Sequence, residues 1–440
     1  MNNSGKRFSV CQAAVLGAVF LLSVCAAGPA LAQERQIDGL LYEKSLVLRY
    51  AERFSVDYYS GKQTGASDAA SDSLYRYISI DGGGDYLVVP EGGSVPEGLG
   101  DDAAILQQPL DSVYLAATSQ MDFFDRLGLT GKVTLSGLEE DGWYSEKARA
   151  AMEDGSMVYA GKYSEPDYET IVTKGCSLAI EATMIYHKPQ VKEMLERFGI
   201  PVMVEHSSYE EEPLGRSEWI RLYGALYGCE EEADRQFLEM EQKVQDVLKE
   251  TGTDAAADAA EGAAGAAAAD AVTEGAAGSS GADAGTESAG AGAAAGQAED
   301  SRPSVAIFSI SSAGTVTVYK SGGYVPKMIT MAGGRYSFDS LKNDSAMSTM
   351  SIPMEDFYAA AKDADYLVYN STIEGEIGSV AELEGKSSLL EEFRAVQEGN
   401  VWCMRASLFQ QPTGIADFLV DLHRMIDGED GGYTYLVKLR

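Results

Sequence analysis

Basic residues are scarce in this chain of 440 residues. Its 34 lysines and arginines face 68 aspartates and glutamates, which gives a net charge of −34. Proteins that bind nucleic acid or an anionic membrane surface present clusters of positive charge. The composition therefore argues against nucleic acid as a partner and against direct binding to a membrane surface. It identifies no partner, because a high negative charge also keeps a protein soluble.

Histidine and cysteine are scarce as well. The three histidines, His187, His206 and His423, are too few and too scattered for the clustered sites that bind zinc or manganese. The five cysteines include no CxxC pair and no spacing typical of a disulfide framework. We therefore expect no bound metal ion, no cofactor and no structural disulfide.

Motifs of common enzyme families are missing too. The chain contains no GxSxG nucleophile elbow, no Walker loop and no HExxH zinc motif. The glycine run Gly82-Gly83-Gly84 lies between two predicted strands, so we interpret it as a turn and not as a phosphate-binding loop. These absences favour a binding protein over an enzyme, and we expect no catalytic residues.

Long apolar runs are confined to the N-terminus. Residues 13–24 are apolar, follow a basic pair, and precede a small-x-small site that ends at Ala32, so residues 1–32 are predicted to be a secretory signal peptide. The run is too short to span a membrane. A second interpretation stays open, because residues 22–25 resemble a lipoprotein box that would make Cys25 a lipid anchor. Both interpretations predict secretion across the cytoplasmic membrane, to the periplasm or the cell surface.

Large side chains nearly disappear between residues 251 and 302. This segment consists almost entirely of alanine, glycine, serine, aspartate and glutamate. Such a composition buries too little apolar surface to offset the entropy lost on ordering. We therefore predict a disordered insertion.

On both sides of this insertion, short apolar strands alternate with helical patterns. The alternation predicts an α/β fold with mostly parallel sheets. We expect an N-terminal lobe over residues 33–228, a long helix over 229–250 and a C-terminal lobe over 303–440. Within the first lobe, residues 38–74 are expected to be mostly helical or irregular, and residues 77–89 to form a β-hairpin.

One αβ unit occurs in both predicted lobes. Pro166-Asp167-Tyr168-Glu169-Thr170-Ile171 opens a short helix before the strand at residues 178–180, and Pro353-Met354-Glu355-Asp356-Phe357-Tyr358 opens another before residues 366–369. Proline suits the first turn of a helix, and the helix dipole stabilises an acid beside it. The repetition indicates two similar lobes, and two lobes joined by one element commonly enclose a ligand.

These segments carry a resemblance to a known family. The chain resembles the substrate-binding proteins of ABC importers, in the class that takes up iron complexes (siderophore or haem) and cobalamin. The resemblance covers roughly residues 75–250 and 303–426 and rests on four further markers: residues 114–131, Asp167–Ile171, Phe198-Gly199-Ile200-Pro201-Val202 and Met331-Ala332-Gly333-Gly334-Arg335. Gly175-Cys176-Ser177 departs from the lysine-proline-aspartate that is usual in the family.

The resemblance implies two Rossmann-like lobes joined by a single long linking helix, with a ligand cleft between the lobes. It implies an extracytoplasmic protein that delivers a ferric siderophore, haem or cobalamin to an ABC permease dimer with its ATPase. In the family, one glutamate on each lobe docks onto permease arginines, and the matching residues are Glu169 and Glu355. From the residues alone, each acid is also explained as a favourable charge at a helix N-terminus.

Ligand-binding residues are expected in loops at the ends of strands that face between the lobes. Aromatic rings there can stack on a planar ligand, and arginines can anchor an anionic one. The candidates are Ser119, Trp143, Tyr144, Tyr209 and Arg216 in the first lobe and Tyr324 and Arg405 in the second. For each arginine, a surface ion pair is the competing interpretation.

Two functions of other classes stay open at this point. One is a ligand-binding sensor module for a signalling receptor. The other is a chelatase-like enzyme on the same two-lobed architecture, which the scarcity of histidine disfavours.

Overall fold

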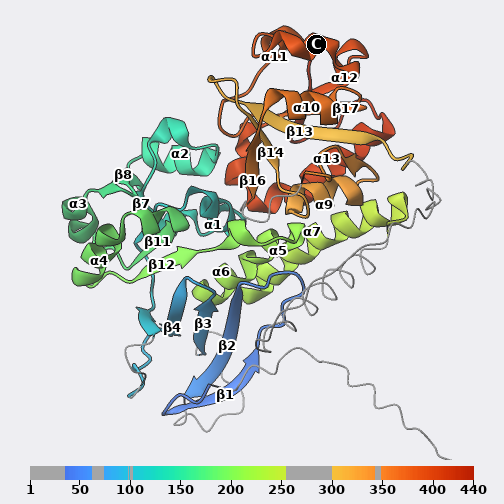
Figure 1. Cartoon of the computed structure of the whole chain (residues 1–440). Coiled ribbons are helices and arrows are strands. Elements are labelled where there is room, and N and C mark those ends of the chain that lie inside the picture. Colours follow the sequence, from blue (N-terminus) through green and yellow to red (C-terminus); the bar gives the residue numbers. More distant parts are fainter. Residues whose placement is uncertain (1–34, 62–73, 98, 100–102, 254–299, 342–347) are drawn as a thin grey trace, which may run out of the picture. The chain divides into compact units, whose positions relative to one another are not determined.

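The structure is a computed structural model that describes residues 35–61, 74–97, 99, 103–253, 300–341 and 348–440 (Figure 1). The predicted signal peptide and nearly all of the predicted disordered insertion lie outside the described residues. The elements named below belong to the compact unit Ile37–Arg440. Within the described ranges, every helix is too short or too polar to cross a membrane.

The first element is a five-stranded sheet. Its order is β1-β2-β3-β4-β5, and all pairs are antiparallel except β4 with β5. The strands are β1 (Leu40–Ser45), β2 (Phe54–Gly61), β3 (Tyr75–Ile80), β4 (Gly84–Val89) and β5 (Ala103–Gln107). The hairpin predicted over residues 77–89 is confirmed as β3 and β4.

The expectation that residues 38–74 are mostly helical or irregular is wrong for the described part of that range. β1 and β2 occupy it, and β2 buries Val56 and Tyr58 while Ser55 points to solvent. This alternation has the two-residue period of a strand. β2 pairs with β1 on one side and with β3 on the other, so the strand depends on pairing with other segments of the chain.

The second sheet is entirely parallel, with the order β12-β11-β6-β7-β8. Its strands are β6 (Val113–Leu115), β7 (Val133–Ser136), β8 (Val158–Tyr159), β11 (Leu178–Ala182) and β12 (Val202–Glu205). The helices between them are α1 (Met121–Arg126), α2 (Glu146–Glu153), α3 (Tyr168–Thr173) and α4 (Pro189–Arg197), and β9 (Gly161–Lys162) and β10 (Glu165–Pro166) form a small separate ladder. Short apolar strands covered by helices are the expected form of a buried parallel sheet.

Three consecutive helices follow β12. They are α5 (Pro213–Glu218), α6 (Ile220–Tyr227) and α7 (Glu230–Thr251). Gly228 ends α6 in the left-handed conformation at φ +73°, which glycine adopts without steric cost. The long helix predicted over residues 229–250 is present as α7, which buries Phe237, Met240 and Val244 on one stripe. At 1.5 Å per residue its 22 residues extend about 33 Å.

The third sheet has the order β16-β14-β13-β17-β18-β19, and β15 also pairs with β13. Its strands are β13 (Ser304–Ile310), β14 (Val316–Tyr319), β15 (Arg335–Tyr336), β16 (Thr349–Ile352), β17 (Tyr366–Asn370), β18 (Val401–Met404) and β19 (Leu436–Lys438). The helices are α9 (Tyr324–Met331), α10 (Met354–Ala361), α11 (Val380–Glu384), α12 (Arg394–Gln397) and α13 (Ile415–Asp427). The central strands β13, β17 and β18 are parallel, and the outer strands β14, β16 and β19 are antiparallel.

The predicted α/β fold with parallel sheets is confirmed. The repeated αβ unit is present twice, as α3 before β11 and as α10 before β17. One hydrophobic cluster runs from the N-terminal sheet through α6 and α7 into the third sheet. We call the second sheet with its helices and the third sheet with its helices the two α/β halves. These halves and the N-terminal sheet share one core and are not separate modules.

Candidate functional site

The loops that follow the parallel strands of the second and third sheets meet each other. In the second sheet these loops carry the short 3-10 helices η2 (Thr118–Gln120), η5 (Thr183–His187) and η6 (Ser207–Tyr209), and in the third sheet the loop after β18 carries η8 (Ala406–Gln410). η2 contacts η8. Ligands of open α/β sheets bind at the carboxyl ends of strands. We call this contact zone the carboxyl-end seam.

Hydrogen bonds of the buried side chains of Asp122 and Gln410 connect the two sides of the seam. The carboxylate of Asp122 on α1 accepts hydrogen bonds from Thr413, at 2.8 Å from the backbone N and at 2.6 Å from Oγ1. Gln410 donates to the carbonyl of Gly142 at 2.9 Å and accepts from the backbone N of Tyr144 at 3.1 Å. Burial raises the pKa of Asp122 to about 6, which the hydrogen bonds from Thr413 oppose. The two α/β halves are thus joined by neutral donors and one desolvated carboxyl group.

A charged part of the seam lies between α5 and α9. The guanidinium of Arg216 stands over the ring of Tyr324, with its central carbon 3.8 Å from the ring centroid. Nε of Arg216 donates to the carbonyl of Glu210 at 3.1 Å, and Nη2 donates to that of Ser208. The structure therefore brings together two residues that we predicted to bind ligand from opposite lobes.

Two ion pairs cross the seam beside this stack. Lys327 of α9 pairs with Glu212, and Nζ of Lys320 lies 4.0 Å from Oε1 of Glu211. All four side chains are partly or fully exposed. The lysines offer positive charge at the seam, and the two glutamates are their present counter-ions.

The other predicted ligand residues differ in how far they are exposed. Trp143 lies in the core with 1% of its surface exposed, and its indole N–H donates to Oγ of Ser136 at 3.1 Å. This differs from the accessible aromatic side chain that its loop position suggested. Tyr144, the next residue, is 46% exposed at the seam. Oγ of Ser119 in η2 accepts from the side chain of Gln120.

Arg405 precedes η8 and does not share a contact with Arg216. Its side chain is exposed, and Nη1 lies 3.9 Å from Oε2 of Glu376 in the same half. This is the surface ion pair that was the competing interpretation for that arginine, and exposed pairs of this kind are weak. Arg405 therefore remains free enough to exchange Glu376 for another anion.

Tyr209 belongs to a ring cluster that sequence reasoning missed. The ring of His206 lies 5.6 Å from that of Tyr209 and 6.1 Å from that of Tyr186, centroid to centroid. Nε2 of His206 is 3.2 Å from the hydroxyl of Tyr186. Burial lowers the pKa of His206, and the nearby Arg53 lowers it further. His206 directly follows β12, and Tyr186 lies in η5, the short helix after β11; this position after an apolar strand was the available signal.

Two buried glutamates lie on the same strands. Glu205 accepts from the backbone N of Ser207 at 2.8 Å and from its Oγ at 2.6 Å. Glu181 is fully buried, and both of its carboxyl oxygens lack a hydrogen-bond partner within the described chain. Desolvation raises the pKa of Glu181 to about 8, so this group is mostly a neutral acid at neutral pH.

The two acids predicted to dock onto a permease are both exposed. Glu169 lies in the first turn of α3 and Glu355 in the first turn of α10. In the described ranges, neither carboxylate pairs with a basic side chain. The N-terminus of α3 is capped by Asp167, whose carboxylate accepts from the backbone N of Thr170 at 3.1 Å. The helix N-terminus therefore already has an acidic cap other than Glu169.

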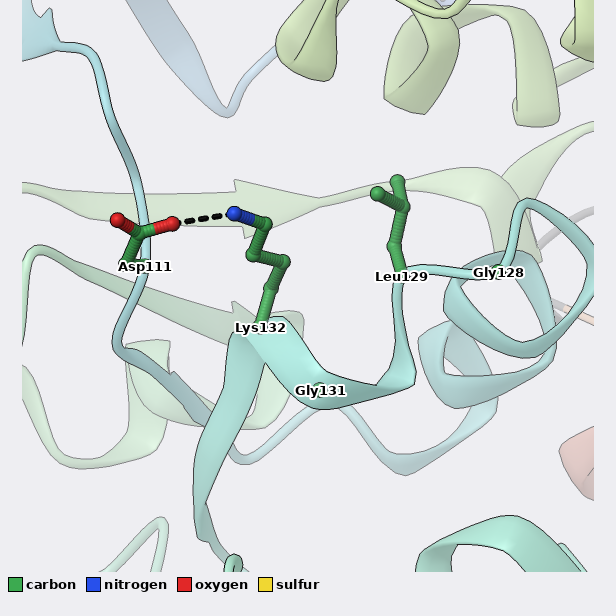
Figure 2. A pocket seen from close by; sticks show the side chains of 5 residues that line it. All are labelled: Asp111, Gly128, Leu129, Gly131 and Lys132. Atoms are coloured by element: carbon green, nitrogen blue, oxygen red, sulfur yellow. Dashed lines mark hydrogen bonds and ion pairs between the residues drawn. The ribbon is translucent and has the colours of Figure 1, made fainter.

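A depression of about 330 Å³ lies elsewhere. Figure 2 shows the five residues that line it. It is lined by Gly128, Leu129 and Gly131 and by the ion pair of Asp111 with Lys132. Asp111 precedes β6 and Lys132 precedes β7, so the depression is at the amino ends of these strands. Since ligands of α/β sheets bind at the opposite ends, we assign it no function.

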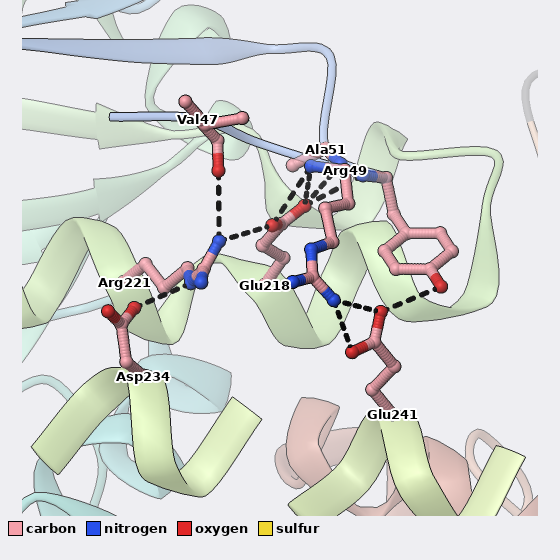
Figure 3. A network of polar contacts seen from close by, with 8 residues as sticks. Val47, Arg49, Ala51, Glu218, Arg221, Asp234 and Glu241 are labelled. Carbon is pink, nitrogen blue, oxygen red and sulfur yellow. Dashed lines mark hydrogen bonds and ion pairs between the residues drawn. The ribbon is translucent and has the colours of Figure 1, made fainter. Parts of the chain in front are cut away.

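A polar network anchors the N-terminal sheet to the helices next to the seam (Figure 3). The buried carboxylate of Glu218 accepts from the backbone N of Arg49, Tyr50 and Ala51 at distances of 2.8 to 3.1 Å. Glu210 does the same for Glu52 and Arg53. Arg221 pairs with Glu218 at 3.0 Å and with Asp234 at 2.8 Å. Five consecutive amides before β2 are therefore held by two acids that flank Arg216.

The side chains of the described residues bear on whether a metal ion could be bound directly. Within the described residues there is no group of three or more histidine, cysteine or acidic side chains that could hold a metal ion. The three described cysteines, Cys176, Cys229 and Cys403, are unpaired. The aromatic rings and cations at the seam instead suit contacts with the organic part of a ligand.

Sequence comparisons give one distant relative. No known protein-family profile matches the chain. A protein described as "Uncharacterized lipoprotein MJ0878", from Methanocaldococcus jannaschii, is 23% identical over 220 residues, which are 47% of this chain. The chain spans about half the length of that relative, 52% of it.

Two solved structures have a similar fold. A periplasmic haem-binding protein from Pseudomonas aeruginosa has a TM-score of 0.50 and 14% identity, covering 75% of this chain and 98% of its own. A periplasmic binding protein from Veillonella parvula has a TM-score of 0.51 and 14% identity, covering 73% of this chain and 93% of its own. The chain therefore has the two-lobed fold of periplasmic binding proteins, as the sequence resemblance implied.

Proposed function

We propose that this chain is an extracytoplasmic substrate-binding protein that delivers a metal complex to an ABC importer. The ligand class is an iron complex, either a ferric siderophore or haem, or cobalamin. The protein itself performs no chemistry on this ligand.

The observation that carries the proposal is the carboxyl-end seam. Two α/β halves present the carboxyl-end loops of their parallel strands to each other, and Arg216 of one half stands over Tyr324 of the other. A ligand that enters between these loops contacts both halves at once, so its binding energy can stabilise one arrangement of the halves. One neighbour of the same fold is described as a haem-binding protein, which supports the ligand class.

Ser119, Tyr144, Tyr209, Arg216, Tyr324 and Arg405 are the residues that we propose to contact the ligand. The aromatic rings would stack on a planar or conjugated surface, and the arginines would pair with acidic groups of the ligand. Trp143 supports this set from the core through its hydrogen bond to Ser136. Recognition then depends on shape and charge, and not on a dedicated metal site.

Glu169 and Glu355 are proposed to dock onto the permease dimer. Each is exposed in the first turn of a short helix, and the two helices occupy equivalent places in the two α/β halves. Exposed carboxylates on two rigid halves can report the separation of the halves to a partner that carries arginines. This would let the permease distinguish loaded from empty protein.

Export and anchoring complete the proposal. The N-terminal pattern supports secretion, with cleavage after Ala32 or lipid attachment at Cys25. The relative from Methanocaldococcus jannaschii is described as a lipoprotein, which favours attachment at Cys25. The membrane would then be reached only through this anchor and the permease.

The test is a thermal-shift screen combined with native mass spectrometry, using ferric siderophores, haemin and cyanocobalamin. A ligand at 100 times its Kd stabilises the folded state by about 2.7 kcal/mol, so the melting temperature should rise with ligand concentration. The metal-free siderophores serve as matched controls. Absence of a stoichiometric complex and of any rise in melting temperature with all three classes would contradict the proposal.

A further inference from the structure

The turn between β3 and β4 reaches the carboxyl-end loops of the second sheet. The hydroxyl of Tyr186 donates to the carbonyl of Gly82 at 2.5 Å, and the hydroxyl of Tyr86 donates to the carbonyls of Gly83 and Val202 at 2.7 and 3.1 Å. Gly82 has φ +71°, and a Cβ added to it would lie 3.1 Å from Cε1 of His206. The N-terminal sheet is therefore fitted closely against the loops after β11 and β12.

At this point of contact, three rings lie side by side. His206 is flanked by Tyr186 and Tyr209, and the hydroxyl of Tyr209 is 3.1 Å from Oγ1 of Thr183. Tyr186 is 46% exposed, and His206 and Tyr209 are half-buried. Each of the three rings is therefore partly accessible, and an accessible aromatic ring can stack on or pack against another ring.

A cation of the N-terminal sheet stands next to these rings. Nε of Arg53 donates to the carbonyl of Tyr209 at 3.1 Å, and its Nη1 pairs with Asp81 at 2.9 Å. The side chain of Arg53 is 37% exposed and that of Asp81 is 69% exposed. An exposed pair of this kind contributes little, so an incoming anion can replace Asp81 at low cost.

We propose that Arg53, Tyr186, His206 and Tyr209 form a subsite for an anionic aryl group of the ligand. The rings supply stacking surfaces, and the guanidinium pairs with a carboxylate or phenolate on the bound ring. This inference extends the proposed function, because the aryl group belongs to the delivered metal complex. The N-terminal sheet then has a role in specificity, since Arg53 and the turn at Gly82 both come from it.

The experiment uses two small probes and the full chain. 2,3-Dihydroxybenzoate carries the anionic aryl group, and cyclohexanecarboxylate carries the same charge without an aromatic ring. Binding is followed in the ¹H–¹³C NMR signals of the histidine rings, which number three in this chain, and His206→Gln assigns the relevant signal. We expect the aryl probe to shift the His206 signal and the aliphatic probe to leave it unchanged.

The matched substitutions are Arg53→Gln and Arg49→Gln. Both arginines lie in the loop before β2, but Arg49 pairs with Glu241 on α7 and not with the ring cluster. We expect Arg53→Gln to weaken binding of the aryl probe about tenfold or more, and Arg49→Gln to leave it unchanged. An unshifted His206 signal in the unmodified protein, or equal effects of the two substitutions, would overturn the subsite.

A second arm separates this inference from the proposed function. The affinities for a ferric catecholate and a ferric hydroxamate complex are compared before and after Arg53→Gln. A selective loss for the catecholate supports the subsite, and an equal loss for both complexes overturns it while the proposed function stands. If the aryl probe shifts His206 but no metal complex binds, the subsite stands and the proposed function fails.

Discussion

Glu218 offers a sharp test of how the N-terminal sheet is held to the helices beside the seam. Its carboxylate is fully buried and accepts from the three consecutive amides of Arg49, Tyr50 and Ala51. It also pairs with Arg221, whose side chain is 9% exposed. Glu218→Ala would leave these buried or partly buried amides and the guanidinium without this acceptor.

The expected loss of stability follows from that arrangement. Removing one partner of a buried ion pair costs about 3–5 kcal/mol when the remaining charge is left uncompensated. Arg221 keeps Asp234 as a second partner, so the lost ion pair supplies only part of that cost. Each unsatisfied backbone donor costs about 1–3 kcal/mol, but the loop can relax and let water reach some of them. We therefore expect Glu218→Ala to lower the free energy of unfolding by about 3–5 kcal/mol, and Glu218→Gln to lower it by less, since one amide oxygen still accepts.

Urea unfolding followed by tryptophan fluorescence measures this difference, because Trp219 is next to the substituted residue and is itself buried. Glu239→Ala is the matched control, since Glu239 lies on α7 in an exposed pair with Arg235. A loss below about 1 kcal/mol for Glu218→Ala, or equal losses for both substitutions, would refute the reasoning. The amides before β2 would then be held by something other than this carboxylate.

Four other outcomes are expected. In the folded chain Glu181 keeps its proton up to a pKa of about 8, whereas in the unfolded chain it loses the proton near the ordinary glutamate pKa of 4.5, so folding takes up a proton and stability falls as pH rises between these values. Glu181→Gln should therefore raise the melting temperature at about pH 8.5 and change it little near pH 4, and a pH-independent difference would contradict the assignment. Arg216→Ala should weaken ligand binding about ten- to a hundredfold, measured by isothermal calorimetry, since charge-assisted contacts contribute about 1.5–3 kcal/mol; an unchanged Kd would remove Arg216 from the site. Glu169→Ala combined with Glu355→Ala should leave ligand binding intact and reduce uptake in a transport assay, and either normal uptake or lost binding would count against docking. Deleting residues 254–299 should leave the melting temperature and the Kd nearly unchanged, because the segment has hardly any large apolar side chains to bury, and a loss of several degrees would show that it packs.

The type and order of most elements were determined by the sequence alone. The strands at residues 113–115, 178–182 and 366–370 and the helix α7 follow from apolar runs, helical periodicity and glycine stops. These signals are local, since each depends on the side chains within one element. The same holds for the repeated units at Glu169 and Glu355, where proline and a nearby acid predicted the start of a short helix.

What the sequence could not determine depends on partners distant along the chain. β2 lies between β1 and β3 and pairs with both, and the alternation of its own side chains was not enough to predict it as a strand. Trp143 lies in a loop after a strand, where a residue of the cleft is expected. Its loop folds back over Ser136, which accepts the indole N–H, and the large indole is therefore buried in the core.

The composition of the candidate site was likewise decided by tertiary structure. Periodicity places Arg216 on a helix but not on the face that meets Tyr324, and only packing of α5 beside α9 brings the two together. His206 and Arg53 become neighbours because the β3–β4 turn fits against the loop after β12. Sequence patterns predict the conformation of a few neighbouring residues. A binding site is instead assembled from loops that come into contact only when the sheets pack.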